Sequence, residues 1–153
     1  MLQFELANEI HATAESVWDA LSTLSEWSTW NRLVPHALGQ LVVGSTLHLK
    51  VRGPDGEVAS LDPLVLSVIP PRELVLEAHV GSRRVLTLSH TFSIESIGYN
   101  ISVLRQCWLA AEPLDENAWS VMCDRLARWI ELGDDLAAYL AEKGQPPSRV
   151  VPA

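Results

Sequence analysis

The sequence predicts one α+β domain in which a curved antiparallel sheet packs around a long C-terminal helix. Three observations predict it. Apolar and polar residues alternate at the start of the chain, as in a half-buried strand. The long central part reads as short strands separated by glycine- and proline-containing turns. After Pro113 the apolar residues change to helical spacing.

The length and composition fit a single domain. The chain has 153 residues, of which 48% are hydrophobic and 20% are charged. A chain of this length buries roughly two-thirds of its unfolded surface without help from metals or disulfides. We expect one domain over residues 1–143 and a flexible tail over 144–153, because the tail contains Gly144 and Pro146-Pro147 and has no periodicity.

Charge and cysteine content exclude several classes of function. A formal net charge of −8 disfavours binding to nucleic acid or an anionic membrane. The apolar run 64–69 ends at Pro70 and is far shorter than the ~20 residues that span a bilayer. Cys107 and Cys123 are too few for a disulfide framework, and no secretory signal is recognisable, so we expect a cytoplasmic protein.

The first elements are a strand and a pair of helices. Residues 2–12 alternate as a strand, with Asn8 on the apolar parity. Thr13 is placed to cap a helix with Glu15 in its first turn. A second, short helical turn begins near Ser25 and carries Trp27 and Trp30.

The central strands form adjacent hairpins. They are expected at 37–43, 45–52, 58–69, 74–80, 84–94 and 99–109, which makes about seven with the first strand. The turns between them are expected at Gly53 to Gly56, Pro70-Pro71, Gly81-Ser82 and Ser96 to Gly98.

The longest helix follows Pro113. Asp115 is placed to cap it. The residues of one face recur every three or four positions, at Trp119, Met122, Leu126, Trp129 or Ile130, Gly133, Leu136 and Leu140.

Three phrases of the sequence resemble a known superfamily. They are "IHATAESVWDALSTLSEWSTWN", "VIPPRELVLEA" with its Pro-Pro-Arg turn, and "LSHTFSIE" with His90 and Phe92. Together with the order of the elements, they resemble the helix-grip fold of the SRPBCC or START-like superfamily, in particular its polyketide cyclase/dehydrase-like branch. The resemblance covers roughly residues 2–143 and implies a cavity between sheet and terminal helix. It leaves the reaction open, because lipid carriers, aromatase/cyclases and Hsp90-activating domains share this fold.

Strand parity gives candidate residues for the inner face of the sheet. On 84–94 the apolar parity is Leu86, Leu88, Phe92 and Ile94, and it includes His90. On 99–109 we take the parity of Tyr99, Ile101 and Val103, which includes Arg105 and Cys107 and turns Trp108 away. With Asn8, this parity places three polar groups inside.

Arg105 has two readings. A buried cation needs a partner or a ligand anion, so Arg105 is a candidate anchor for a carboxylate, enolate or phenolate, with His90 and Asn8 orienting the ligand. The structural alternative pairs Arg105 with Glu95, Asp124 or a helix carbonyl, or turns it to solvent. His90 likewise either satisfies a core hydrogen bond or acts as a general acid or base.

The predicted ligand-binding set combines these groups with aromatic and flexible walls. It consists of Asn8, Trp30, Leu88, His90, Phe92, Val103, Arg105, Met122, Leu126 and Trp129. Trp108 and Trp119 are further candidate walls. No metal site or cofactor is expected, and a homodimer is left open.

Three functions remain open. The leading hypothesis is a protein that binds a hydrophobic small molecule, lipid-like, aromatic or polyketide-like, between sheet and helix. The first alternative is a cyclase/dehydrase-type enzyme in which His90 or Arg105 stabilises an enolate. The second is a co-chaperone or membrane-recruitment adaptor, which predicts an exposed apolar patch around Trp27.

Overall fold

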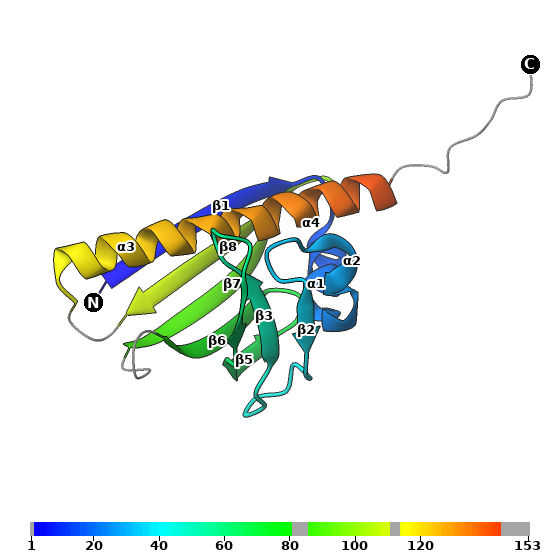
Figure 1. Ribbon diagram of the computed structural model, residues 1–153. Helices are drawn as coiled ribbons and strands as arrows, with labels where there is room; N and C mark the ends of the chain where they lie inside the picture. Colours follow the sequence, from blue (N-terminus) through cyan, green and yellow to red (C-terminus); the bar gives the residue numbers. More distant parts are fainter. Residues whose placement is uncertain (1, 81–85, 111–113, 145–153) are drawn as a thin grey trace, which may run out of the picture.

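A long helical rod lies across a curved antiparallel sheet in the computed structural model, which describes residues 2–80, 86–110 and 114–144 (Figure 1). The strands are β1 (Leu2–Ile10), β2 (His36–Leu38), β3 (His48–Arg52), β4 (Val58–Leu61), β5 (Leu64–Ile69), β6 (Glu73–Val80), β7 (Leu86–Gly98) and β8 (Ile101–Ala110). The helical segments are α1 (Ala14–Ser22), η1 (Leu24–Glu26), α2 (Trp27–Trp30), α3 (Glu116–Leu126), η3 (Ala127–Trp129) and α4 (Ile130–Lys143). The α+β prediction is therefore confirmed.

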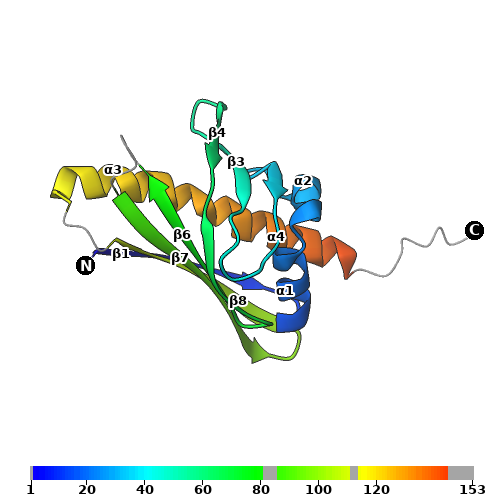
Figure 2. The same ribbon diagram turned by 90° about the horizontal axis from the view of Figure 1, so that it is seen from below.

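The strands of the described residues form two sheets. The larger has the order β1-β8-β7-β6-β5, and every neighbouring pair in it is antiparallel. The smaller has the order β2-β3-β4, and the segment just before β3 bridges to β5 of the larger sheet through Thr46 and Leu64. Seen from below, the two sheets curve around the long helix (Figure 2). The sheets and the helix therefore surround a common interior.

The predicted helix starts are confirmed by their caps. Thr13 Oγ1 accepts the N–H of Ser16 at 3.1 Å and begins α1, whose Val17 and Leu21 are fully buried. Asp115 Oδ1 accepts the N–H of Ala118 at 2.7 Å and begins α3. A capped start and a periodic apolar face place each helix.

The terminal helix is held to the sheet by two polar contacts. Gln106 of β8 donates from Nε2 to the carbonyl of Trp129 at 3.0 Å, at the short 3₁₀ turn η3 that separates α3 from α4. Asn8 of β1 packs against Gly133 and donates from Nδ2 to Asp134 Oδ1 at 2.8 Å. A side chain on Gly133 would overlap Asn8, so this glycine lets helix and strand approach closely.

Three expected strand boundaries are wrong. The strand expected at 37–43 is only three residues long, at 36–38. The strand expected at 58–69 is two strands, β4 and β5, because Pro63 lacks the N–H that a continuous ladder needs. The turn expected at 96–98 lies two residues later, where Asn100 adopts a positive φ of 56°.

Some expectations lie outside the described residues. These are the turn at Gly81-Ser82 and the flexibility of the tail beyond Gly144. Within the described residues, no helix combines the length and the apolar content that a membrane crossing requires.

Candidate functional site

The interior between the sheets and the helical rod contains an apolar cavity of about 210 Å³. Its walls come from β6, β7 and β8 of the larger sheet, from β3 and β4 of the smaller sheet, and from α3 and η3. Its lining residues are Trp27, Leu49, Val51, Ala59, Ser60, Leu61, Pro63, Leu76, Ala78, Val80, Leu88, His90, Phe92, Trp108, Met122, Arg125, Leu126 and Trp129.

Strand alternation explains why the floor of this cavity is apolar. On β6, Leu76 and Ala78 are buried and line the cavity, whereas Glu77 between them lies on the other face. Leu88 and Phe92 continue the floor on β7. Because successive side chains alternate, every second residue of these strands faces the helix.

His90 is the buried polar side chain on this floor. Its exposed fraction is 6%. The imidazole stacks on Trp108 with ring centres 4.2 Å apart and lies 4.1 Å from the ring of Phe92. Trp129 meets it edge-on at 5.0 Å. Aromatic rings thus fix the imidazole in a largely dry environment.

A hydrogen-bonded relay connects His90 to the helix. His90 Nε2 lies 3.0 Å from Gln106 Oε1, and Gln106 Nε2 donates to the carbonyl of Trp129. Gln106 is completely buried. Both polar ends of its amide are therefore satisfied, as a buried amide requires.

Burial lowers the pKa of His90 from 6.5 to about 3, and the hydrogen bond to Gln106 only partly opposes this effect. The imidazole is therefore neutral at neutral pH. A neutral ring with so low a pKa is a weak base.

The cavity reaches the surface between β4 and α3. Ala59 and Ser60 of β4 and Arg125 of α3 line it and are exposed. Arg125 is the charged residue among those that line the cavity in the described part of the chain. The mouth therefore carries two polar side chains, Ser60 and Arg125, whereas the interior is apolar apart from His90.

Six of the ten residues predicted to bind a ligand line this cavity. They are Leu88, His90, Phe92, Met122, Leu126 and Trp129. The other four, Asn8, Trp30, Val103 and Arg105, are not among the residues that line it.

The inward orientation predicted for Arg105 and Val103 is wrong. The register pairs His90 with Trp108 and Phe92 with Gln106, so the even-numbered residues of β8 share the inner face with those of β7. Arg105 therefore lies outside, 51% exposed, with Nη2 at 4.0 Å from Glu95 Oε2. That weak surface pair is one of the structural alternatives that the sequence left open.

Asn8 and Trp30 are buried for structural reasons. Asn8 is used in docking α4, through its contact with Gly133 and its bond to Asp134. Trp30 stacks on Tyr139 with ring centres 6.1 Å apart, which joins α2 to α4. Both side chains hold the helix in place.

Sequence reasoning missed Gln106 and Trp27, and it turned Trp108, a candidate wall, away from the cavity. Gln106 and Trp108 were assigned to the outer face by the same parity error, and pairing them with the even residues of β7 is the signal that finds them. Trp27 was expected on an exposed patch, but it is 1% exposed and its indole N–H donates to the carbonyl of Leu21 at 3.0 Å. The adaptor function therefore loses the observation on which it depended.

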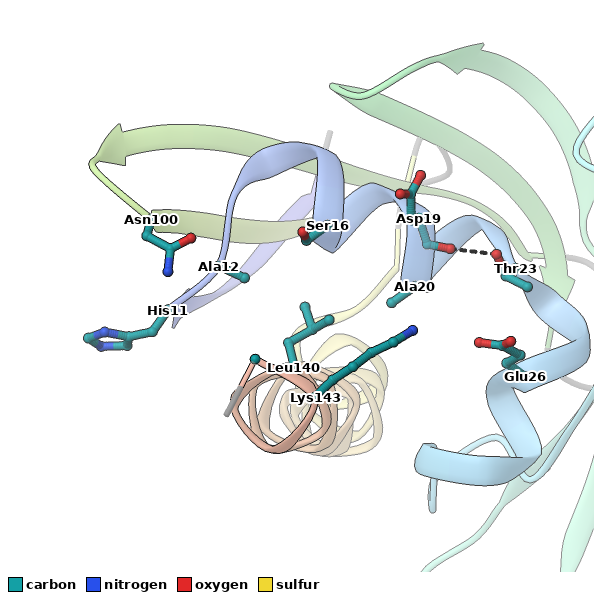
Figure 3. A pocket seen from close by; sticks show the side chains of 11 residues that line it. His11, Ala12, Ser16, Asp19, Ala20, Thr23, Glu26, Asn100, Leu140 and Lys143 are labelled. Atoms are coloured by element: carbon teal, nitrogen blue, oxygen red, sulfur yellow. Dashed lines mark hydrogen bonds between the residues drawn. The ribbon is translucent and has the colours of Figure 1, made fainter. Parts of the chain in front are cut away.

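A second hollow of about 490 Å³ lies at the other end of α4 (Figure 3). Leu140 and Lys143 of α4 form one wall, facing Asp19 and Ala20 of α1, with Glu26 beyond them. Asp19, Glu26 and Lys143 are exposed, so water solvates this hollow. Although it is larger, it lacks the dry, convergent lining of the interior cavity.

Solved structures with the same fold share little sequence identity with this chain. A START superfamily protein from Mycobacterium smegmatis has a TM-score of 0.71 and 14% identity, covering 92% of this chain and 98% of its own. The Zhui aromatase/cyclase from a Streptomyces species has a TM-score of 0.74 and 12% identity, covering 97% and 99%. No protein-family model matches the sequence, and no curated protein matches it either.

These similarities confirm the helix-grip, START-like fold that the sequence phrases predicted. At such identities they extend to the fold alone, and the function has to be argued from the cavity.

Proposed function

We propose that this protein binds a hydrophobic small molecule in the cavity between the larger sheet and the junction of α3 and α4. The observation that carries the proposal is an apolar cavity, open at one mouth, in which His90 is the buried polar side chain among the described lining residues and lies among aromatic rings. Cavities of this composition are typical of ligand sites, where apolar walls supply affinity and few polar groups supply orientation. The fold shared with START-like proteins supports the same function.

The cavity volume favours a small ligand. An engineered apolar cavity of about 150 Å³ accommodates benzene, and the cavity here has about 210 Å³. One substituted aromatic ring fits this space, whereas a long acyl chain would extend through the mouth or need the helix to move. Of the three ligand types expected from the sequence, the aromatic one is therefore favoured.

Filling the cavity tests the proposal. The probe is 4-ethyltoluene, titrated by calorimetry into the wild type and into Ala78→Leu, which adds three carbon atoms to the lining. Ala118→Leu is the matched control, because Ala118 is exposed on α3. We expect the wild type and the control to bind and Ala78→Leu to lose at least about tenfold in affinity. Equal binding by all three proteins would refute the proposal.

A cyclase/dehydrase-type activity is the second candidate, supported by the fold of the Zhui aromatase/cyclase and by a histidine in the cavity. Burial lowers the pKa of His90 to about 3, which makes proton abstraction by its imidazole slow at neutral pH. We therefore place binding first. Turnover of a reactive poly-β-ketone by the wild type but not by His90→Phe would reverse that order.

A further inference from the structure

We propose that the molecule bound in the cavity carries a hydroxyl or N–H group that donates a hydrogen bond to Nδ1 of neutral His90. We further propose that Gln106 imposes this preference, because it fixes the tautomer of His90. The inference rests on the proposed binding function and narrows its ligand class. It follows from the direction of two consecutive hydrogen bonds in the protein, which leave one acceptor for the ligand.

The first bond fixes the orientation of the Gln106 amide. The carbonyl oxygen of Trp129 only accepts hydrogen bonds, so the atom of Gln106 that lies 3.0 Å from it has to be the donor Nε2. The reverse orientation would place two carbonyl oxygens against each other in a completely buried position.

The second bond fixes the tautomer of His90. With Nε2 of Gln106 facing the helix, its Oε1 faces the imidazole at 3.0 Å and only accepts. His90 Nε2 therefore carries the proton and donates it. A neutral imidazole has one N–H, so Nδ1 is left with a lone pair.

The third hydrogen bond is the one that a ligand supplies. Within the described residues, Nδ1 of His90 has no hydrogen-bond partner. In the described residues, the side-chain atoms that are both fully buried and unpartnered belong to Asn8, Trp30 and Asn31. Nδ1 of His90 is not one of them. Because His90 lines the cavity, Nδ1 is the acceptor available to a bound molecule.

This acceptor discriminates between classes of ligand. A hydroxyl or N–H group donates a hydrogen bond to Nδ1. A carboxylate only accepts hydrogen bonds, so at the same depth it would face the Nδ1 lone pair and would have no buried cation beside it. Arg125, the charged lining residue of the described chain, lies at the exposed mouth. The geometry thus selects a small, neutral, ring-sized donor.

The test uses three probes that share one ring and differ in one group: 4-ethylphenol, 4-ethyltoluene and 4-ethylbenzoate. In an apolar site without a partner, the methyl compound binds better, since a buried hydroxyl loses its water. We expect the opposite in the wild type, with 4-ethylphenol at least about tenfold tighter than 4-ethyltoluene by calorimetry. The carboxylate should bind most weakly.

Two variants locate the preference. His90→Phe keeps a ring in the aromatic stack and removes the acceptor, so 4-ethyltoluene should become the tighter ligand. Leu61→Ala is the control, because it alters the opposite wall of the cavity, on β4, and should leave 4-ethylphenol preferred. Gln106→Leu frees the imidazole to change tautomer and should reduce the preference.

Nitrogen NMR of the wild type keeps the inference falsifiable if a variant does not fold. The spectrum should show His90 protonated at Nε2 and unprotonated at Nδ1, with the Nδ1 signal shifted by 4-ethylphenol and hardly by 4-ethyltoluene. Protonation at Nδ1 in the wild type, or equal affinity for both probes, would overturn the inference while leaving the binding function intact. Failure of every probe to bind would instead overturn the proposed function itself.

Discussion

The two halves of the terminal helix differ in how they meet the rest of the molecule. In α4, Leu132, Leu136 and Leu140 are buried, and Asn8 docks against Gly133. In α3, Leu126 alone is buried, while Met122 and Trp119 are half-buried. The two halves run on as one rod in Figure 1, with α1 and α2 beside α4.

This difference separates stability from ligand access. Side chains of α4 fill the core, so changes there should cost folding free energy. Side chains of α3 and of η3 roof the cavity and its mouth, so changes there should alter binding. Residues that bury few apolar contacts have low local stability, which suits a segment that a ligand must pass.

The largest expected effect is the loss in free energy of unfolding caused by a substitution in α4. Leu136→Ala removes a completely buried side chain and should lower the free energy of unfolding by about 3 kcal/mol. Met122→Ala should lower it by less than about 1 kcal/mol, because Met122 already borders empty space. Urea denaturation of both variants measures the contrast, and equal losses would break the proposed division.

The next effect concerns the contact between Gly133 and Asn8. A Cβ on Gly133 would overlap the Asn8 amide, so Gly133→Ala should destabilise the protein by about 2 kcal/mol. In an Asn8→Ala background the same substitution should be neutral or stabilising, since alanine has the higher helix propensity by about 1 kcal/mol. A double-mutant cycle with no coupling would show that the close approach does not restrict position 133.

The free energy of unfolding should depend on pH through His90, which lies on β7 against Trp129 at the junction of α3 and α4. The pKa of His90 is lowered from 6.5 to about 3 in the folded state, so the unfolded state alone takes up the proton between these values. The stability due to this group is complete above pH 6.5 and is lost progressively as the pH drops toward 3.

The measurement is the difference in pH dependence between the wild type and His90→Phe, whose free energy of unfolding should fall less steeply in acid. Leu88→Ala, on the same strand face, is a control that lowers stability without altering the slope. Identical slopes for the wild type and His90→Phe would contradict the neutral, buried state of the imidazole.

The smallest effect should appear in binding on the α3 side. Met122→Ala trims the roof of the cavity and should weaken 4-ethylphenol about threefold to tenfold. Val121→Ala on the exposed face of the same helix is the matched control and should bind as the wild type does. An effect of Val121→Ala as large as that of Met122→Ala would place the ligand elsewhere.

The fold was largely predictable from the sequence because its signals are local. Thr13 and Asp115 cap the helices as expected, and alternation marks β1, β6 and β7. The break at Pro63 was missed, since proline ends a ladder only where its missing N–H is needed, which depends on the neighbouring strand.

The site was only partly predictable because it depends on strand register. On β8 both parities contain apolar residues, with Ile101 and Val103 on one face and Leu104 and Trp108 on the other. Composition could not choose between them, and the choice put Arg105 inside and Gln106 outside. Register is set by the turn at Asn100 together with the irregularity between Ser96 and Gly98, which shifts the pairing by one residue and so moves every following side chain to the other face.

The most direct test of the binding cavity is an NMR measurement of contacts between the wild-type protein and bound 4-ethylphenol. We predict nuclear Overhauser effects from the ring protons of the probe to the methyl groups of Met122 and Leu126. No such effects should reach Ala20 or Leu140 of the second hollow. Contacts confined to Ala20 and Leu140 would contradict the account.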